Sequence, residues 1–240
     1  MSGYYEVHCH ILPGVDDGAR DMDETIRMLK AYYADGVRTI YATSHYRKRM
    51  FEPSMDKIIS QYNQVKKKAR EIGEGITVYL GCEFHANMDM VETLDAGERP
   101  VMGNSRCVLT EFSSASELSF IRERSYALLS HGYQPIIAHA ERYPVLTKNP
   151  QIIGDLVDMG AYIQVNAESI LGDEGFSIKR FCRKLMKLDL IHFIGSDAHD
   201  SKERRPQIGR CAEYLEKKMG REYVEKILIR NPQNLIEEKR

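Results

Sequence analysis

The segment Tyr4-Tyr-Glu-Val-His-Cys-His10 has the character of a buried β-strand that ends in imidazole side chains. Aromatic and β-branched residues of this kind favour a pleated surface. Because side chains alternate along a strand, His8 and His10 point to one side and Cys9 points to the other. We therefore expect Cys9 to lie in the core. The same combination of a short apolar run and a polar end recurs along the chain.

Six further runs resemble the first, so the sequence predicts seven strands. They are Tyr4–His8, Thr39–Ser44, Ile76–Gly81, Cys107–Glu111, Pro135–His139, Tyr162–Val165 and His192–Gly195. Amphipathic stretches with apolar residues at helical spacing lie between them. The expected helices are Asp23–Asp35, Ser54–Ile72, Glu117–His131, Pro150–Met159, Ser177–Leu188, Ile208–Met219 and Glu222–Leu228.

Three glycines, Gly36, Gly132 and Gly160, stand where helices should stop in a left-handed cap. The alternation of strands and helices predicts an α/β fold with a parallel sheet and right-handed crossovers. Periodicity does not separate a closed barrel from an open sheet. We expect the sheet to be closed into a barrel.

The chain has 240 residues, 42% of them hydrophobic and 29% charged, which is an ordinary globular composition. This length suits one α/β barrel domain over residues 1–240. Lys and Arg number 34 against 35 Asp and Glu, a formal charge of −1, so the basic excess typical of nucleic-acid binding is missing. No run approaches the ~18 apolar residues of a membrane span, and Met1–His10 does not resemble a signal peptide.

The five cysteines are an odd number without C-x-x-C spacing, which favours a reducing, cytoplasmic compartment. None is followed six residues later by Arg, as a cysteine-nucleophile phosphatase would require. The chain also lacks a G-x-x-x-x-G-K-[ST] loop and a G-x-S-x-G elbow. These chemistries are therefore excluded.

Polar residues gather at the C-terminal ends of the expected strands, where α/β folds carry their chemistry. Five of the eight histidines in the chain are among them. The residues in chain order are His8, His10, Ser44, His45, Glu83, Glu111, His139, Glu141, Arg142, Asp197 and His199. With few cations nearby to pair the carboxylates, we expect bound metal. Imidazole and carboxylate ligands without thiolate suit Mn, Fe or Zn better than Ca or Mg.

Four other polar residues receive more ordinary interpretations. Asp16 is expected to form a simple Asp-Gly turn with its neighbours. His131 precedes Gly132 at a helix end and fits a capping role. His192 begins a strand and is expected to be structural, whereas His85 remains undecided.

The ordered set of strand-end residues resembles a polymerase-and-histidinol-phosphatase (PHP) domain. The resemblance is closer to one branch, the metal-dependent bacterial protein-tyrosine phosphatases of capsule and exopolysaccharide clusters (CpsB/YwqE type). The stretches Thr43–Glu52, Ile137–Tyr143, Ile163–Asn166 and Gly195–His199 carry it, and it extends from about Tyr4 to Ile236. An H-x-H pair alone is a weak signal, but the ordered set is specific.

The resemblance implies a distorted seven-stranded (β/α) barrel with three divalent metal ions, Mn first and Fe or Zn as alternatives. The first metal would take His8, His10, Glu83 and Asp197. The second would share Glu83 and add Glu111 and His139. The third would take Asp17, His45 and His199.

The resemblance also implies the reaction. A water between two metals would lose its proton, because metals lower its pKa from ~16 toward ~7, and the hydroxide would attack phosphorus in line. Arg142 and Arg204 match arginines that the family uses on the substrate phosphate. Arg205 follows directly, so the second assignment stays open by one residue. The implied substrate is phosphotyrosine in the tyrosine-rich tail of a polysaccharide-regulating kinase.

Other readings remain open. A small-molecule phosphatase of the histidinol-phosphatase kind would use the same nine ligands. A non-catalytic, metal-stabilised kinase-binding module is a third, although a complete ligand set argues against it. A proofreading nuclease of the polymerase type fits poorly because the chain is not basic. The segment Arg20–Thr25 departs from the motif that relatives use for oligomer contacts, so a homo-oligomer is left open.

Overall fold

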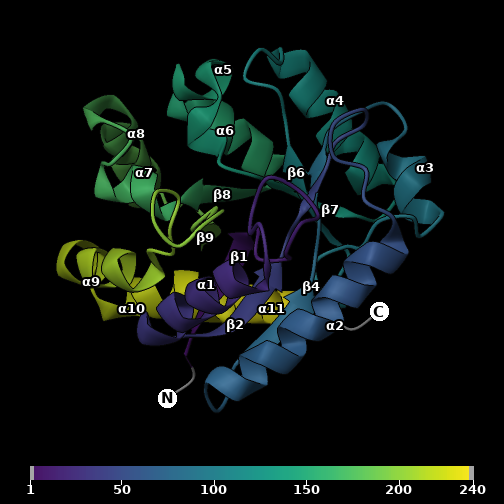
Figure 1. Cartoon of the computed structure of the whole chain (residues 1–240). Coiled ribbons are helices and arrows are strands. Elements are labelled where there is room, and N and C mark those ends of the chain that lie inside the picture. The colour runs from purple at the N-terminus through teal and green to yellow at the C-terminus, as the bar shows by residue number, and fades with distance from the viewer. Residues whose placement is uncertain (1–2, 238–240) are drawn as a thin grey trace.

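Within residues 3–237, which the computed structural model describes, nine strands lie at the centre and helices surround them (Figure 1). The strands are β1 (Tyr4–Cys9), β2 (Val37–Ala42), β3 (His45–Tyr46), β4 (Thr77–Leu80), β5 (Glu83–His85), β6 (Cys107–Glu111), β7 (Gln134–Ile137), β8 (Tyr162–Asn166) and β9 (Phe193–Gly195). All the pairings between these strands are parallel. The expected α/β fold with a parallel sheet is confirmed.

The strands form a three-stranded sheet, β1-β2-β4, and a six-stranded sheet, β3-β5-β6-β7-β8-β9. Backbone hydrogen bonds continue between the two sheets. On one side, Glu83 N donates to Ser44 O at 3.2 Å. On the other side, His10 N donates to Ala198 O at 2.9 Å and Asp197 N donates to His8 O at 2.8 Å. The sheet therefore curls until the C-terminal end of β1 meets the chain that leaves β9. Closure into a seven-stranded barrel stays a prediction.

The longer helices agree with the expected ones to within one or two residues. They are α1 (Met22–Ala34), α2 (Met55–Ile72), α4 (Leu118–Ser130), α6 (Pro150–Asp158), α8 (Phe176–Lys187) and α9 (Ile208–Met219). Side-chain caps fix three of the starts, because Asp21 accepts from Glu24 N at 2.8 Å, Ser54 accepts from Lys57 N at 3.3 Å and Asn149 accepts from Gln151 N at 3.0 Å. Gly36, Gly132 and Gly160 have φ of 82°, 75° and 113°, so the predicted left-handed helix ends are confirmed.

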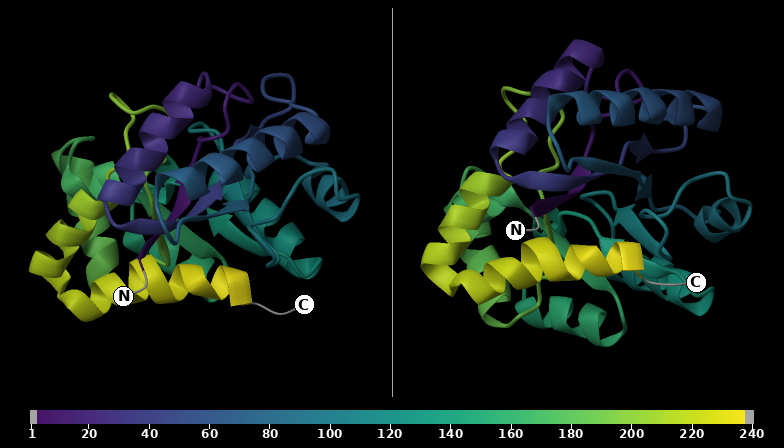
Figure 2. Two further views of the ribbon diagram at one scale, coloured as in Figure 1. Left: turned by 60° about the horizontal axis from the view of Figure 1, so that its bottom comes forward. Right: turned by 90° about the horizontal axis from the view of Figure 1, so that it is seen from below.

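The expected helix Glu222–Leu228 is divided into α10 (Arg221–Glu225) and a π-helical turn, η2 (Lys226–Arg230). Several short helices were not predicted, because each spans too few residues to display a helical period. They are α3 (Met90–Asp95), the 3₁₀ turn η1 (Ala140–Arg142), α5 (Pro144–Thr147), α7 (Ala167–Leu171) and α11 (Asn231–Glu237). Figure 2 shows α9, α10 and α11 following one another along one side of the molecule, and α9 contacts α1.

The apolar core has two parts. The larger part lies between strands and helices and contains Cys9, as expected. A smaller part inside the curled sheet contains Tyr5 and Val7. The pairing of β1 with β2 is irregular between Glu6 and Cys9, and such irregularities re-aim side chains. The result is that His8 faces the polar end of the curl rather than the helices.

All five cysteines are buried, and none of them forms a disulfide within the described residues. None of the helices formed within residues 3–237 is long and apolar enough to cross a bilayer.

Candidate metal centre

The expected ligand residues converge at the C-terminal ends of the strands. His8 lies in β1 and His10 directly after it, His45 begins β3, and Glu83 begins β5. Glu111 ends β6, and the other members follow strands: His139 two residues after β7, and Asp197 and His199 after β9. Asp17 comes from the loop that follows β1. Parallel strands bring these ends to one edge, so residues nearly 200 positions apart in the chain meet.

The most deeply buried group comprises His8, His10, Glu83 and Asp197, whose candidate ligand atoms lie within 4.8 Å of one another. Glu83 Oε2 lies 3.1 Å from His8 Nε2 and 3.2 Å from His10 Nε2. Asp197 Oδ1 lies 3.5 Å from the first of these nitrogens and 3.4 Å from the second. This is the set that the family resemblance implies for the first metal.

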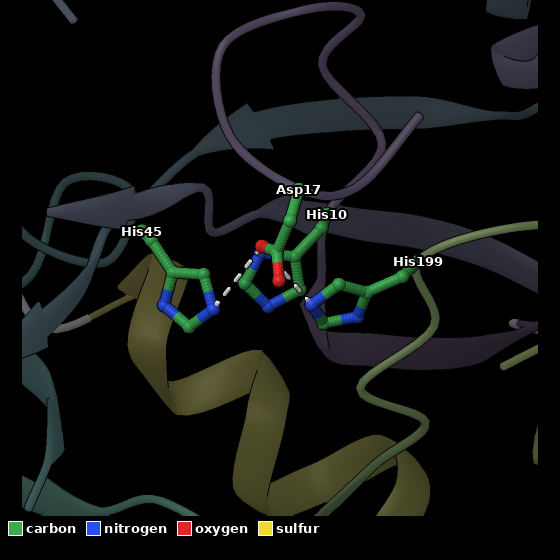
Figure 3. A group of neighbouring side chains, drawn as sticks. All are labelled: His10, Asp17, His45 and His199. Carbon is green, nitrogen blue, oxygen red and sulfur yellow. Dashed lines mark ion pairs between the residues drawn. The ribbon is translucent and has the colours of Figure 1, made fainter. Parts of the chain in front are cut away.

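A second group contains His10, Asp17, His45 and His199, again within 4.8 Å (Figure 3). Asp17 Oδ1 lies between two imidazoles, 3.6 Å from His45 Nε2 and 3.6 Å from His199 Nε2. The rings of His10 and His199 lie 3.9 Å apart between centroids. The set implied for the third metal is thus together, and His10 adjoins it as well.

A third group contains His45, Glu83 and Glu111. His139, implied for the second metal, lies beside it, with Nε2 2.9 Å from Glu83 Oε1. His45 Nδ1 lies 2.9 Å from Glu83 Oε2 and 3.9 Å from Glu111 Oε2. Glu83 therefore touches four imidazoles and links the groups.

Orphaned polar atoms test whether this donor set fits metal ions. Among the described residues, buried Glu83 Oε2, Glu111 Oε2, His45 Nδ1 and His199 Nε2 lack a hydrogen-bond partner. Buried polar atoms rarely stay unsatisfied in native proteins. His8 Nε2 and His10 Nε2 also lie 3.4 Å apart. Two neutral imidazoles that face each other at this distance can form only one hydrogen bond between them. Nitrogen and carboxylate donors turned toward one another fit divalent ions of the Mn, Fe or Zn kind.

The charges in this cavity stabilise one another strongly. Burial alone would raise the pKa of Glu83, but the nearby His8 and His45 outweigh it and hold that pKa well below its ordinary value. The pKa of Asp197 is also held well below its ordinary value, because His8 and His10 outweigh burial. Glu111 differs: burial and the charge of Glu83 raise its pKa. The ionised forms of Glu83 and Asp197 thus depend on neighbouring imidazoles, whereas Glu111 is held less firmly in its ionised form.

Two expected ligands have strained backbones. His139 has φ 32° and Asp197 has φ 52°, in the left-handed region that non-glycine residues seldom adopt. Both stand immediately beyond a strand, where the chain turns away from the sheet. Such strain clusters at functional sites, because the surrounding structure must hold it in place. It directs both side chains into the cavity.

A further shell of side chains orients the imidazoles. Asp16 Oδ2 accepts from His10 Nδ1 at 2.8 Å and from His45 N at 2.8 Å. Gln164 Oε1 lies 3.1 Å from His8 Nδ1, and the Tyr143 hydroxyl lies 3.2 Å from His139 Nδ1. Partners of this kind fix the ring orientation of metal-binding histidines.

The sequence prediction for Asp16 was therefore incomplete. Its side chain makes the turn bond to Gly18 N at 3.0 Å, but it also joins two candidate ligands. An Asp-Gly pair reads as a turn because nothing local distinguishes the two roles. Gln164 and Tyr143 were within the stretches that carry the resemblance, yet no role had been assigned to them.

The other histidines occupy ordinary positions. His131 ends α4 and its Nδ1 bonds to Ala127 O at 2.9 Å, which confirms the expected capping role. His192 Nδ1 accepts from Ile163 N at 3.2 Å and so ties β8 to the segment before β9, as a structural residue does. His85 pairs in register with Glu111 but joins none of the three groups.

A cavity of about 430 Å³ opens over the groups. Its lining includes five expected residues, Asp17, His45, Glu111, His139 and Asp197, and three arginines, Arg47, Arg142 and Arg204. Arg142 donates to Asp197 at 2.6 Å, to Glu168 at 2.6 Å and to Glu174 at 2.8 Å. The expectation of few cations at this edge was wrong. Three arginines reach the cavity, two of them from loops and one from a 3₁₀ turn.

The geometry also separates Arg204 from Arg205. Arg204 Nη2 donates to Asp197 Oδ2 at 3.1 Å and lines the cavity. Arg205 is exposed, and its charge acts on Asp35, beside the start of α9. Arg204 is therefore the one of the pair that faces the candidate site.

The chain is similar to known proteins over almost its whole length. A family model described as capsular polysaccharide synthesis, CpsB/CapC, matches residues 4–237. The tyrosine-protein phosphatase CpsB of Streptococcus pneumoniae is 33% identical over 236 residues, which cover 96% of this chain and 97% of that protein. The tyrosine-protein phosphatase YwqE of Bacillus subtilis is 31% identical over 217 residues, covering 90% of this chain and 85% of its own.

Solved structures give the same result. A structure from work on YwqE of Bacillus subtilis and CpsB of Streptococcus pneumoniae, called unique metal-dependent tyrosine phosphatases, matches with a TM-score of 0.90 and 30% identity. The match covers 98% of this chain and 95% of that one. A phosphotriesterase homology protein from Escherichia coli shares the fold alone, with a TM-score of 0.61 and 14% identity. The chain belongs to the CpsB/CapC family of capsular polysaccharide synthesis proteins.

Proposed function

We propose that this protein is a metal-dependent protein-tyrosine phosphatase. Its substrate is phosphotyrosine on a bacterial tyrosine kinase that regulates capsular or exopolysaccharide synthesis. The observation that carries the proposal is the convergence of three candidate ligand groups and three arginines at one open cavity. Relatives named as tyrosine-protein phosphatases match over almost the whole chain, which supports the same activity here.

The proposed ligands are the nine residues that the sequence indicated, His8, His10, Asp17, His45, Glu83, Glu111, His139, Asp197 and His199. They would hold three divalent ions, with Mn the first choice and Fe or Zn as alternatives. When bound, such ions lower the pKa of water and neutralise a phosphate. Asp16, Gln164 and Tyr143 would keep the imidazoles in the orientation that binding requires.

The charge balance supports this proposal. The four proposed carboxylate ligands carry about −4 beside five imidazoles, and a phosphate dianion would be repelled by them. Three divalent ions would bring about +6, which makes the ligand set about +2. The near-neutral composition of the chain conceals this local charge, because the ions are not part of the sequence.

The arginines would bind the phosphate oxygens. Arg142 projects its guanidinium to Asp197 from one side, while Glu168 and Glu174 hold the other two nitrogens. Its fork is thereby fixed, which suits a planar, bidentate contact with phosphate. Arg204 approaches the same Asp197 oxygen from the loop after β9. Together they would stabilise the negative charge on the equatorial phosphoryl oxygens in the transition state.

The test is hydrolysis of a phosphotyrosyl peptide by protein loaded with Mn and by protein stripped with a chelator. We expect turnover only with metal, and its loss in His139→Ala and Asp197→Ala. His131→Ala, at a helix end outside the cavity, is the matched control and should keep full activity. Full activity in stripped protein would contradict the proposal.

The same assay separates the alternatives. Faster turnover of histidinol phosphate than of the peptide would indicate a small-molecule phosphatase. Peptide binding without any turnover of p-nitrophenyl phosphate would indicate a binding module.

The proposal also covers the closure of the sheet, the extent and location of the domain, and the segment of the substrate. The curled sheet is a distorted seven-stranded barrel of the PHP type, with β2 and β3 as one interrupted strand and β4 and β5 as another. Residues 1–240 form one phosphatase domain, working in the cytoplasm, where its five cysteines, which form no disulfide among the described residues, would stay reduced. The kinase segment it acts on is a tyrosine-rich tail. Size measurement in solution decides whether the protein is a homo-oligomer.

A further inference from the structure

A tight hairpin borders the cavity on the side of His45. Arg47 N donates to Phe51 O at 2.9 Å, and Phe51 N donates back to Arg47 O at 2.8 Å. Arg49 reverses the chain with φ 67°, and its N–H donates to Glu52 Oε2 at 2.9 Å. Lys48 forms an ion pair with Asp89. These bonds hold the backbone of residues 47–51 in a turn beside the cavity.

The hairpin presents an aromatic ring beside a proposed ligand. The ring of Phe51 stacks on His45, with centroids 5.3 Å apart and planes inclined by 10°. His45 in turn points toward Asp17 (Figure 3). The other aromatic residues that line the cavity, Phe112 and Tyr143, are each 2% exposed and pack against each other. Phe51 is only half-buried, so it is the ring available to a ligand.

The hairpin also presents a cation that other residues do not neutralise. Arg142 makes ion pairs with three carboxylates and Arg204 makes one. Within the described part of the chain, Arg47 makes none, although it lines the same cavity. Arg47 follows β3, the neighbour of β5, whereas Arg142 and Arg204 meet at Asp197.

We propose that the hairpin Arg47–Phe51 determines the specificity for aryl phosphates. Phe51 contacts the tyrosyl ring, and Arg47 binds the phosphate from the side opposite Arg142. This inference rests on the proposed phosphatase function and adds to it a reason for tyrosine. An alkyl phosphate would meet the same metal ligands and arginines, but would gain nothing from the Phe51 ring.

The test uses two ligands that cannot be hydrolysed, phenylphosphonate and methylphosphonate, so that leaving-group chemistry plays no part. Their binding to Mn-loaded protein is measured by calorimetry. We expect Phe51→Ala to weaken phenylphosphonate by ~5-fold and methylphosphonate by less than ~2-fold. Phe51→Tyr should restore the preference. Arg47→Met should weaken both ligands by ~10-fold or more, because it removes a charge-assisted contact.

Arg49→Met is the matched control, since Arg49 lies in the same hairpin but does not line the cavity. Metal content and thermal unfolding are measured for every variant. Equal weakening of both ligands in Phe51→Ala, or a loss of metal from it, would overturn the inference, because the ring would then only support His45. Unchanged binding in Arg47→Met would remove Arg47 from the site. Failure of the wild type to hydrolyse p-nitrophenyl phosphate would instead contradict the proposed function.

Discussion

Single carboxylates in this protein act on more than one neighbour, and Asp16 shows why that matters. One of its oxygens accepts from the His10 ring and from the backbone of His45, and the other accepts from Gly18 N. In a neutral imidazole, a buried anion bonded to Nδ1 keeps the proton on that nitrogen, so that Nε2, which faces Glu83 and Asp197, can bind a metal. A residue that looks like part of a turn therefore sets the tautomer of a proposed ligand.

Replacing Asp16 with Asn removes the charge but keeps the shape. We expect the affinity for Mn to fall by ~10- to 100-fold, as it does when outer partners of ligating histidines are changed. Competition with a chelator of known affinity measures the loss. Asp23→Asn, at an exposed position of α1, should leave the affinity unchanged. Equal affinities in Asp16→Asn and the wild type would contradict the positioning role.

Arg142 is held so firmly that its removal should affect substrate and not metal. Arg142→Ala should lower kcat/KM for p-nitrophenyl phosphate by ~100-fold, because Glu168 and Glu174 would then face the phosphate without their cation. Elemental analysis should find the same metal content as in the wild type. Normal kinetics in this variant would remove Arg142 from the site.

At the residue scale, the candidate ligands could be predicted from the sequence more completely than the residues that orient them. The ligand candidates follow strands, and strand ends can be recognised from the apolar runs before them. Asp16, Gln164 and Arg47 could not be found in this way, because their roles depend on contacts between segments far apart in the chain. Arg205 illustrates the same limit: only the turn of the loop distinguishes it from Arg204.

Among the elements, β1 and β9 must lie very close to each other where Gly195 faces His8. A Cβ added at Gly195 would lie 2.5 Å from the Cβ of His8. Gly195→Ala should therefore push the two strands apart, with a loss of ~1–3 kcal/mol of unfolding free energy and weaker metal binding. Gly154→Ala in α6 is the control, because its Cβ would meet only Gln151 at 3.5 Å. The control should gain ~0.5–1 kcal/mol in urea unfolding.

His192 connects β8 with the approach to β9, and its burial has a pH dependence. Burial and the charge of Lys226 lower its pKa to about 4, against about 6.5 in an unfolded chain. The unfolded state therefore binds the proton first, and stability falls as the pH drops from 6.5 to 4. At pH 5 the loss from this residue is ~2 kcal/mol.

The variant His192→Asn keeps an acceptor for Ile163 N but does not titrate. In metal-free protein, the difference in unfolding free energy between pH 7 and pH 5 should be smaller in this variant than in the wild type. Parallel pH curves for the two proteins would show that His192 does not titrate as its burial requires.

Elements were predictable where they were long. The helix α2 has 18 residues and several apolar positions on one face, so its period is visible in the sequence. By contrast, α5 has 4 residues and α7 has 5. Their helical form comes from the turns they make after β7 and β8, and the sequence contains no repeat from which to infer it.

For the whole molecule, the alternating pattern predicted the parallel sheet, but composition could not reveal what happens at one end of it. A chain of charge −1 collects carboxylates, imidazoles and arginines into one cavity. Long-range pairing achieves this, and residue counts do not record it. The consequence is a high density of charged groups in one cavity, whose carboxylates bound metal ions would neutralise.

Removal of metal should therefore lower the stability of the whole protein. Ions that bind only the folded state add RT ln(1 + [L]/Kd), or ~2.7 kcal/mol per site at 100 times Kd. Without them, protonated imidazoles must stand in for the missing cations. Burial lowers the pKa of His10, but Asp16 and the other carboxylates outweigh it and hold that pKa well above its ordinary value. Burial likewise opposes the raised pKa of His8, which Glu83 and Asp197 sustain.

The sign of the pH effect follows from these raised values. A histidine whose folded pKa exceeds about 6.5 stabilises the metal-free protein fully below that pH, and this contribution is lost as the pH rises through the folded pKa. The metal-loaded protein needs these imidazoles neutral, so it loses nothing in that range. The difference in Tm between loaded and chelator-treated protein should therefore grow from pH 6.5 to pH 8. Calorimetry at the two pH values measures it, and a constant or shrinking difference would show that the imidazoles do not replace the ions.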